Sequence, residues 1–319
     1  MATLFRDRLP QLDGRLFLTD GGQETTFVFH DGLALPEFAA FDLLRRDGGE
    51  AHLAAYYRSY AAIAAHDRVG LILEAPTWRA SSDWGQRLGY APQALDAANR
   101  RAIALLAHLR DELRGSLGLD AVVISGCVGP RGDGYKPGQL MSAVEAERYH
   151  RRQIESFSQG DADIISAMTM NYVEEALGIA RAARRAGMPV AISFTVETDG
   201  RLPTGQTLRA AIEHVDNETG GYPIYYMINC AHPVHIERAL DGGLWQNRLR
   251  GLRANASAKS HAELDQATEL DSGNPAEFGR QYAHLKQRLP QLNVLGGCCG
   301  TDTRHVASVA AECAGLFAG

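Results

Sequence analysis

Short runs of apolar and β-branched residues recur along the chain, separated by longer stretches in which apolar residues lie three and four positions apart. The short runs predict buried strands, and the longer stretches predict amphipathic helices. We expect strands at residues 15–19, 69–73, 121–125, 163–167, 190–195, 224–228, 248–254 and 293–295. We expect helices at residues 52–65, 92–114, 143–159, 173–186, 208–216, 233–241 and 275–287. Such an alternation indicates a parallel sheet, and eight strands are the number that closes a barrel.

The seventh predicted strand and the segment after it are the least regular parts of this pattern. Residues 248–254 (RLRGLRA) are more basic than a typical buried strand, and residues 255–274 are polar without a clear period. We interpret the second segment as a long loop at the end of the barrel where active sites form.

The predicted fold is a single (β/α)8 TIM-type barrel of the α/β class, with residues 1–319 as one domain. No linker rich in proline, glycine and serine divides the chain. The competing fold is a doubly wound sheet, which would need a glycine-rich phosphate-binding turn after its first strand. The turn at residues 19–25 (TDGGQET) lacks the G-x-G-x-x-G spacing, so the barrel is preferred.

The charge balance narrows the range of partners. The 319 residues carry 38 acidic and 32 basic side chains, interspersed, for a formal charge of −6. We therefore expect neither a nucleic acid nor a membrane as partner. The chain has no apolar stretch of about 18 residues and no signal-peptide pattern at its start, which predicts a cytoplasmic protein. We expect a monomer or a small homo-oligomer.

Polar and sulfur-containing residues follow the predicted strands, and in a parallel barrel these positions meet at one end. They are Asp20, Glu24, Glu74, Thr77, Trp78, Cys127, Met168, Thr169, Asn171, Glu197, Asp199, Asn229, Cys230, Asn255, Cys298 and Cys299. Thiols from the sixth and eighth strands should therefore lie together, although 68 positions separate Cys230 from Cys298.

Three converging thiols are a possible metal site. Zinc binds thiolates in a tetrahedral shell, and a catalytic site uses three protein ligands with one position open. Cys230, Cys298 and Cys299 would supply that shell, with flanking glycines at 296, 297 and 300 that let the backbone bend. The residues alone leave a second interpretation open, because free cysteines are also common as small buried side chains. The odd total of five cysteines does not look like a disulfide framework.

Four further residues near these thiols fit structural roles better than metal ligation. Cys127 lies in the same layer of the barrel but is flanked by small and apolar residues, and Cys313 falls in an alanine-rich C-terminal helix. His232 and His305 each stand near a predicted helix start, where a histidine is more often a cap than a ligand.

Two strings resemble the cysteine signatures of the zinc-dependent homocysteine S-methyltransferase family: NCAHP at 229–233 and GGCCGTD at 296–302. Weaker agreement comes from DGGQET at 20–25, GP at 129–130, SFTV at 193–196 and GRL at 200–202, so the resemblance runs from about residue 13 to residue 310. It implies a barrel that transfers a methyl group from a small onium donor, such as S-methylmethionine or betaine, to the sulfur of homocysteine, giving methionine. It also implies Zn²⁺ as cofactor, with Cys230, Cys298 and Cys299 as its ligands and the catalytic centre.

The substrate contacts that we expect are Asp20, Glu24, Glu74, Trp78, Met168, Thr169 and Asn255. The length of the chain leaves no room for the cobalamin and folate modules of large methionine synthases, so we expect a small donor. A cationic donor suits aromatic faces and acids. Trp78, Phe27, Phe29 and Tyr135 are candidates for the first role, and Asp20 and Glu74 for the second.

Two positions depart from the family pattern. The family usually carries Glu-Thr after its fourth strand, where the glutamate holds the substrate amino group, but this chain has Met168-Thr169. Either another acid, such as Glu74, Asp20 or Glu197, takes the ammonium, or the acceptor is not homocysteine. After the seventh strand a Tyr-Pro-Asn string is common, and this chain has Arg-Ala-Asn at 253–255.

Three functions therefore remain open. The first is zinc-dependent methyl transfer to homocysteine, and the second is the same chemistry on a different thiol or selenol. The third is a non-catalytic zinc-sensing or thiol-sensing barrel, in which the cysteines bind metal or are oxidised reversibly.

Overall fold

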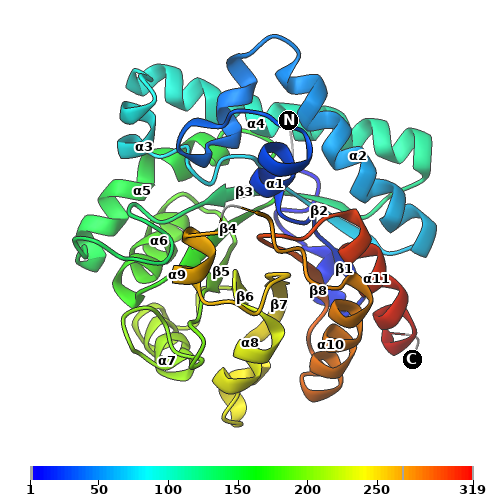
Figure 1. Cartoon of the computed structure of the whole chain (residues 1–319). Helices are drawn as coiled ribbons and strands as arrows, with labels where there is room; N and C mark the ends of the chain where they lie inside the picture. The colour runs from blue at the N-terminus through cyan, green and yellow to red at the C-terminus, as the bar shows by residue number, and fades with distance from the viewer. Residues whose placement is uncertain (1–2, 268, 318–319) are drawn as a thin grey trace.

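Parallel strands close into a barrel in which β1 pairs with both β2 and β8 (Figure 1). The computed structural model describes residues 3–267 and 269–317. Over these residues the strands are β1 (Phe17–Leu18), β2 (Gly70–Glu74), β3 (Val122–Val128), β4 (Ile164–Met170), β5 (Val190–Phe194), β6 (Tyr225–Asn229), β7 (Leu249–Ala254) and β8 (Val294–Gly297). The predicted (β/α)8 barrel is confirmed, and each predicted strand is present with ends that differ by a few residues.

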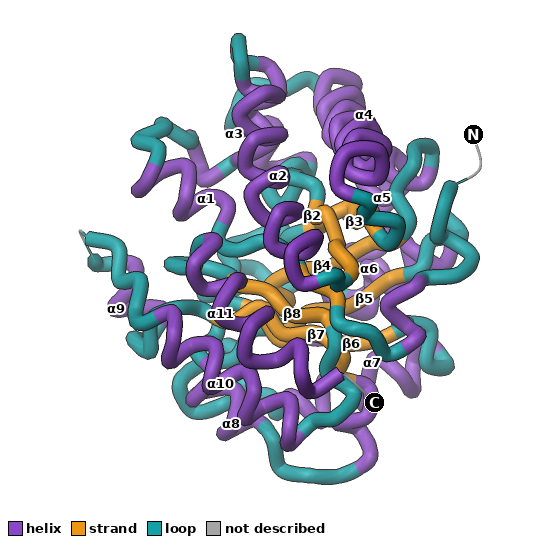
Figure 2. Tube along the Cα trace, turned by 90° about the vertical axis from the view of Figure 1, so that its right-hand side faces the viewer, coloured by secondary structure: helices purple, strands orange, loops and turns teal. Residues whose placement is uncertain are grey.

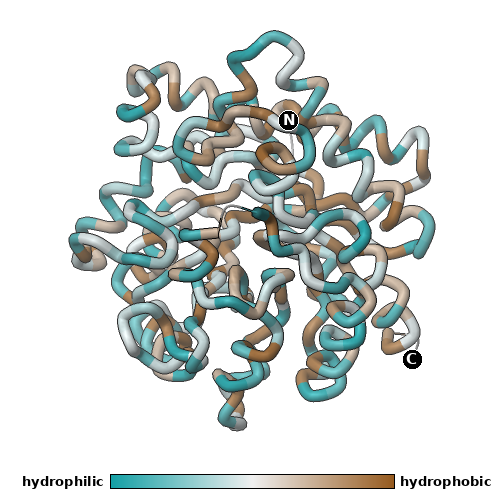
Figure 3. The backbone as a smooth tube through the Cα atoms, viewed as in Figure 1, coloured by the Kyte–Doolittle hydropathy of each residue, from teal (hydrophilic) through white to brown (hydrophobic). Residues whose placement is uncertain are grey.

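Helices surround the strands on all sides, as the side view in Figure 2 shows. They are α1 (Gln23–Thr25), α2 (Gly49–Asp67), α3 (Ser82–Arg87), α4 (Pro92–Leu117), α5 (Ala143–Ser158), α6 (Val173–Arg185), α7 (Leu208–Thr219), α8 (Pro233–Ala239), α9 (His261–Asp265), α10 (Pro275–Arg288) and α11 (Thr303–Cys313). Along the outer helices hydrophilic and hydrophobic positions alternate (Figure 3), as expected for helices with one buried face. Among the described residues, none of these helices has the length and apolar character needed to cross a membrane.

The segment after β7 differs from the prediction of an irregular loop, because it contains the short helix α9. The helix begins at a capping box, in which Ser260 accepts a bond from the Glu263 backbone and the Glu263 carboxylate accepts one from the Ser260 backbone. Such caps satisfy the free N–H groups of a first turn. A helix of five residues has too few periodic positions to be seen in the sequence pattern.

The interior of the barrel has an apolar half and a polar half. At the amino end of the strands a small cluster of buried residues fills the barrel: Leu9, Phe17, Ile72, Val123, Ile164, Ala191, Tyr225, Met227 and Val294. Two residues further along, the inward positions of β2, β3 and β4 become Glu74, Ser125 and Ser166, which are hydrogen-bonded to one another. The larger apolar cluster lies between the strands and the helices. The polar half therefore sits at the carboxyl ends of the strands.

Strand β7 is buried despite its basic sequence. Leu249 and Leu252 belong to the apolar cluster outside the barrel, and Arg253, on the opposite face of the strand, is also buried. The guanidinium of Arg253 makes an ion pair with Asp20, which follows β1. A buried charge needs such a partner, and the partner comes from a strand that is remote in the sequence.

Candidate metal centre

Three thiols meet at the carboxyl end of the barrel. Cys230 directly follows β6, and Cys298 and Cys299 directly follow β8. Their sulfur atoms all lie within 4.8 Å of one another, and they form the one such group of three among the histidine, cysteine and acidic side chains of the described chain. The Sγ atoms of Cys230 and Cys299 are 3.9 Å apart. The convergence expected from barrel geometry is therefore present.

Cys230 and Cys298 are joined by a disulfide, with their Cα atoms 5.5 Å apart. The sequence did not suggest a disulfide framework, and this is the one disulfide among the five cysteines, all of which the structure describes. Barrel closure brings their Cα atoms to a separation that a disulfide spans without backbone movement. Cys127, Cys299 and Cys313 are unpaired. Metal ligation requires thiolates, so the disulfide and a metal-bound cluster are alternative states of the same cysteines.

The cluster fits a metal ion that prefers sulfur in tetrahedral geometry. With metal–sulfur bonds of about 2.3 Å, the sulfur atoms of a tetrahedral site stand about 3.8 Å apart. The separation of 3.9 Å between Cys230 and Cys299 matches this edge. Three such ligands leave a fourth position for another donor.

Cys230 is held in a backbone conformation that favours glycine, with φ of 54°. Such a conformation costs a non-glycine residue about 1–3 kcal/mol unless its surroundings enforce it. Here the N–H of Cys230 donates to the carbonyl of Arg253 at 3.1 Å. The carbonyl of Cys230 accepts bonds from His261 Nε2 at 2.6 Å and from Thr195 at 3.3 Å. Hydrogen bonds from β7, from the residue after β5 and from α9 thus fix the backbone of Cys230 and orient its thiol.

Thr169 adopts a similar left-handed conformation, with φ of 63°, and Asn229 holds it there. The Asn229 Oδ1 accepts bonds from the Thr169 backbone N–H at 2.8 Å and from Ser193 at 2.6 Å. Its Nδ2 donates to the Thr169 hydroxyl at 2.8 Å and lies 3.9 Å from the Sγ of Cys298. The amide therefore connects the end of β4 to the sulfur cluster.

Two aromatic rings cover the cluster. The rings of Tyr135 and His261 are stacked, with centroids 3.9 Å apart, and the Tyr135 hydroxyl lies 3.6 Å from the Sγ of Cys299. His261 Nδ1 bonds to Glu197 at 3.0 Å. Both ring nitrogens of His261 therefore face oxygen atoms, one of Glu197 and one of the Cys230 carbonyl. His261 carried no signal in the sequence pattern, and its role emerges from the position of α9.

The most buried ion pair of the site joins Arg253 to Asp20. Arg253 Nη2 donates to Asp20 Oδ1 at 2.6 Å, and Tyr56 donates to the other carboxylate oxygen at 3.1 Å. Burial opposes the charge on Arg253, but the carboxylates of Asp20 and Glu74 outweigh that effect and raise the pKa of Arg253. Burial raises the pKa of Asp20, with Arg253 acting against the rise. Asp20 is thus occupied by protein partners, and Arg253 is a site residue that sequence reasoning did not identify.

Two further acids, Glu74 and Glu24, have raised pKa values. Burial raises the pKa of Glu74 to about 7, although Arg253 opposes this effect. Its Oε1 accepts a bond from Ser166 at 2.9 Å, and its buried Oε2 has no partner among the described residues. Burial likewise raises the pKa of Glu24 to about 7. Both predicted substrate acids lie near Asp20 and Arg253, whose charges act on them.

The predicted aromatic contacts divide between the site and the core. One face of Trp78 carries the guanidinium of Arg79, 4.1 Å from the ring centroid, so a protein cation already covers that face. Phe27 is fully buried and packs edge-on against Tyr56, as a core residue does. Phe29 is 46% exposed on the turn after α1. Of the four aromatics, Tyr135 has the direct contact with the cluster.

The remaining predicted residues lie at the same end of the barrel. Met168 and Thr169 are buried on β4. Asn255 follows β7, with its backbone N–H bonded to Ala231 at 3.0 Å and its Oδ1 buried without a partner in the described structure. It lines a narrow, partly open hollow, together with Val196, Glu197, Thr198, Ala231, His232, His235, Lys259, Ser260 and His261.

The residues expected to be structural have structural contacts. His232 caps α8 by accepting a bond from the backbone of Val234, and His305 bonds to Asp302, the residue that caps α11. Cys313 is fully buried in the apolar cluster. Burial raises the pKa of Cys127 well above its ordinary value, so this thiol remains protonated.

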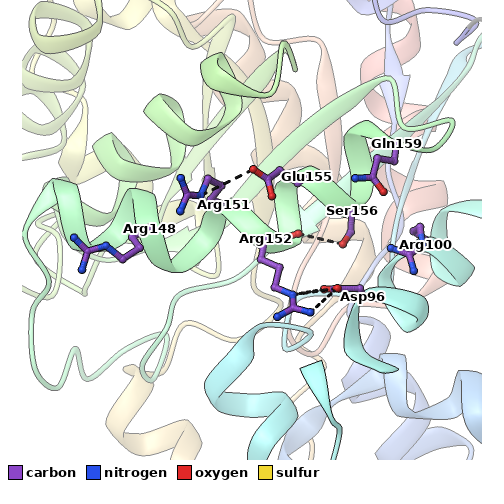
Figure 4. A pocket seen from close by; sticks show the side chains of 8 residues that line it. All are labelled: Asp96, Arg100, Arg148, Arg151, Arg152, Glu155, Ser156 and Gln159. Atoms are coloured by element: carbon purple, nitrogen blue, oxygen red, sulfur yellow. Dashed lines mark hydrogen bonds and ion pairs between the residues drawn. The ribbon is translucent and has the colours of Figure 1, made fainter. Parts of the chain in front are cut away.

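A second hollow lies on the outside of the barrel between α4 and α5 (Figure 4). Its volume is about 450 Å³, and it is lined by Asp96, Arg100, Arg148, Arg151, Arg152, Glu155, Ser156 and Gln159. Arg152 is paired with Asp96 and Arg151 with Glu155. The hollow contains none of the cysteines.

The chain thus forms a closed parallel barrel with three cysteines that converge at its carboxyl end. The model of the homocysteine S-methyltransferase family matches residues 17–313, and the chain belongs to this family.

The fold is similar to solved structures of the homocysteine methyltransferase MmuM from Escherichia coli. The metallated form matches with a TM-score of 0.71 at 18% identity, over 94% of this chain and 97% of that one. The oxidized form matches with a TM-score of 0.73 at 19% identity, over 97% and 99%. At these identities the comparison establishes the fold.

Two curated proteins share parts of the sequence. Betaine–homocysteine S-methyltransferase 1 of Mus musculus is 23% identical over 190 residues, which are 54% of this chain and 45% of that protein. Methionine synthase of Mycobacterium tuberculosis is 30% identical over 173 residues, 49% of this chain and 13% of that protein. The chain thus matches less than half the length of either relative.

The bonds of His261 predict a role in metal affinity. Replacement His261→Ala removes the donor to the Cys230 carbonyl and the partner of Glu197. Outer contacts of this kind typically contribute 10–100-fold to metal affinity, so we expect a loss of at least tenfold, measured by competition with a chromophoric chelator. The control His284→Ala alters an exposed histidine that is paired with Glu237. Equal affinities of the two variants would contradict this role.

The burial of Glu74 predicts a pH-dependent stability. Its folded-state pKa of about 7 exceeds the ordinary value of 4.5. Between these pH values the folded protein retains a proton that the unfolded chain releases, so this group lowers stability as pH rises. Glu74→Gln removes this effect, so its free energy of unfolding should gain about 1–3 kcal/mol relative to the parent protein between pH 5 and pH 7. Urea unfolding at the two pH values measures it, with exposed Glu213→Gln as control. A difference independent of pH would refute the assignment.

Proposed function

We propose that the protein is a zinc-dependent S-methyltransferase, which moves a methyl group from a small onium donor to the sulfur of homocysteine. The observation that carries the proposal is the group of three thiols at the carboxyl end of the barrel. Family membership supports the reaction class. The named donors of the reaction, S-methylmethionine or betaine, are proposed from the family alone.

The donor set supports zinc as the metal. Cys230, Cys298 and Cys299 would hold it as thiolates and leave one position for a substrate. When bound, zinc supplies the Lewis acidity that keeps a substrate thiol deprotonated at neutral pH. The proton of the acceptor thiol is lost to solvent, its sulfur forms a bond to the donor methyl carbon, and the electron pair of the broken bond stays on the donor atom. A sulfonium donor leaves as a thioether, and an ammonium donor as an amine.

The protein side chains position the reactants. Three cysteinates carry negative charge, which attracts a cationic donor toward the acceptor sulfur. The Tyr135 hydroxyl lies beside Cys299, and the stacked ring of His261 bonds to the carbonyl of Cys230. Asn229 and Thr169 connect β4 to Cys298 and fix the wall beside it. Holding two reactants in line contributes several kcal/mol to such a reaction.

A different thiol acceptor remains the second candidate, because Met168 stands at the end of β4. A thioether has no charge with which to bind an ammonium group. The acids that could compensate are Asp20, Glu74 and Glu197, and the first and last of these are bonded to Arg253 and His261.

Metal content and methyl transfer of the reduced protein test the proposal. We expect zinc near one per chain, and methionine formation from homocysteine with S-methylmethionine or betaine. Cys298→Ser should lose the metal and all activity, because a hydroxyl is a much weaker zinc ligand than a thiolate. Cys127→Ser is the matched control, since this buried thiol lies in the same barrel but outside the cluster, and it should retain both. A reduced protein that binds no zinc would refute the proposal.

A further inference from the structure

Several acidic side chains of the site are paired with protein groups or have pKa values raised by burial. Asp20 is paired with Arg253, and Glu197 is paired with His261. Glu24 and Glu74 are buried enough that each is only partly ionised near neutral pH. Met168 adds no charge. Of the three acids that could take an ammonium group in place of the missing glutamate, Asp20 and Glu197 thus already have protein partners, and Glu74 is buried.

The guanidinium of Arg253, in contrast, has one nitrogen without a hydrogen-bond partner among the described residues. Its Nε donates to the Gly297 carbonyl at 3.0 Å, and its Nη2 donates to Asp20 at 2.6 Å and to the Gly21 carbonyl at 3.2 Å. Its Nη1 has no hydrogen-bond partner among the described residues, and it does not belong to the fully buried polar atoms of the chain. The residue is 7% exposed. The guanidinium is thus fixed by three bonds, while Nη1 has no hydrogen-bond partner among the described residues.

Arg253 lies next to the peptides that carry the thiols, because its own carbonyl accepts a bond from the Cys230 N–H. Gly297 immediately precedes Cys298, so the peptide that carries a thiol of the cluster also accepts a bond from Arg253. An acceptor whose sulfur joins the three thiols would extend its other end past this guanidinium.

We propose that Arg253 binds the carboxylate of the acceptor thiol, and that the site does not recognise an ammonium group. The acceptor class is then an alkyl thiol with a carboxylate, for which an amino group is dispensable. A guanidinium suits this role because a charge-assisted bond to a carboxylate is stronger than a neutral hydrogen bond. The inference rests on the proposed function, since it requires a thiol at the cluster.

Four thiols that share a chain of three carbons attached to the sulfur, and differ in the groups on the third carbon, test the assignment. Their binding is measured by calorimetric titration of the reduced, zinc-loaded protein. Homocysteine has both groups, 4-mercaptobutanoate has the carboxylate only, 3-mercaptopropylamine has the amine only, and 1-propanethiol has neither. We expect the two carboxylate thiols to bind within about threefold of each other, and at least tenfold more tightly than the other two. Tenfold corresponds to about 1.4 kcal/mol, within the range of a charge-assisted hydrogen bond.

The four thiols also differ in the pKa of the thiol group, which itself affects binding. Variants of Arg253 separate the two effects, because they leave the pKa of each thiol in solution unchanged. Arg253→Met leaves Asp20 buried without its partner and is expected to destabilise the fold. The double variant Asp20→Asn with Arg253→Met removes both charges and keeps the experiment interpretable. It should lose at least tenfold in affinity for the carboxylate thiols and change little for the other two. Arg253→Lys should restore part of the carboxylate preference, because it keeps the charge but not the fork of donors.

Arg248→Met is the control, because Arg248 precedes β7 at the opposite end of the barrel and pairs with Asp216. It should keep the parent order of affinities. Tighter binding of 3-mercaptopropylamine than of 4-mercaptobutanoate, or an equal loss for all four thiols in the double variant, would overturn the role of Arg253 while leaving the proposed function standing. If none of the four thiols binds, the proposed function fails and this inference fails with it.

Discussion

Closure of the barrel in parallel register is the constraint on which the site depends. β8 pairs with β1 on one side and with β7 on the other, in a register that sets Leu18 opposite Leu295 and Ala254 opposite Gly297. The chain segments that follow β6 and β8 therefore leave the sheet at one end and close to each other, and the thiols that they carry meet. β1 has only two residues, but it completes the ring of hydrogen bonds. A one-residue slip of β8 would turn its inward positions outward and disperse the cluster.

The chemistry of the site depends on which buried charged groups have partners within the protein. The apolar amino half of the barrel gives way to a polar carboxyl half, in which burial raises the pKa of Glu74 and the more strongly buried charges are paired. Asp20 and Arg253 form one pair, and Glu197 and His261 form another. Removing water from charges costs free energy that only such partners offset. In the proposed zinc-bound state, the three cysteinates supply the negative charge that faces a cationic donor, beside the atom that receives the methyl group.

Much of this architecture could be predicted from the sequence. Strands and helices were visible because buried strands are short and apolar, whereas amphipathic helices repeat every three to four residues. The meeting of Cys230 with Cys298 followed from barrel geometry alone. The Arg253–Asp20 pair could not be predicted, because 233 positions separate its members and the basic sequence of β7 is unlike a typical buried strand. The role of His261 depends on α9, a helix too short to show a period in the sequence. The Cys230–Cys298 disulfide depends on the distance between the two Cα atoms, which the sequence does not give.

The central claim is that three cysteines bind zinc and leave one position for the acceptor sulfur. X-ray absorption at the zinc edge of the reduced, zinc-loaded protein measures the ligand shell directly. The account predicts three sulfur atoms at about 2.3 Å and one lighter atom without substrate, and four sulfur atoms after addition of homocysteine. A shell with fewer than three sulfur atoms, or one that homocysteine leaves unchanged, would contradict it.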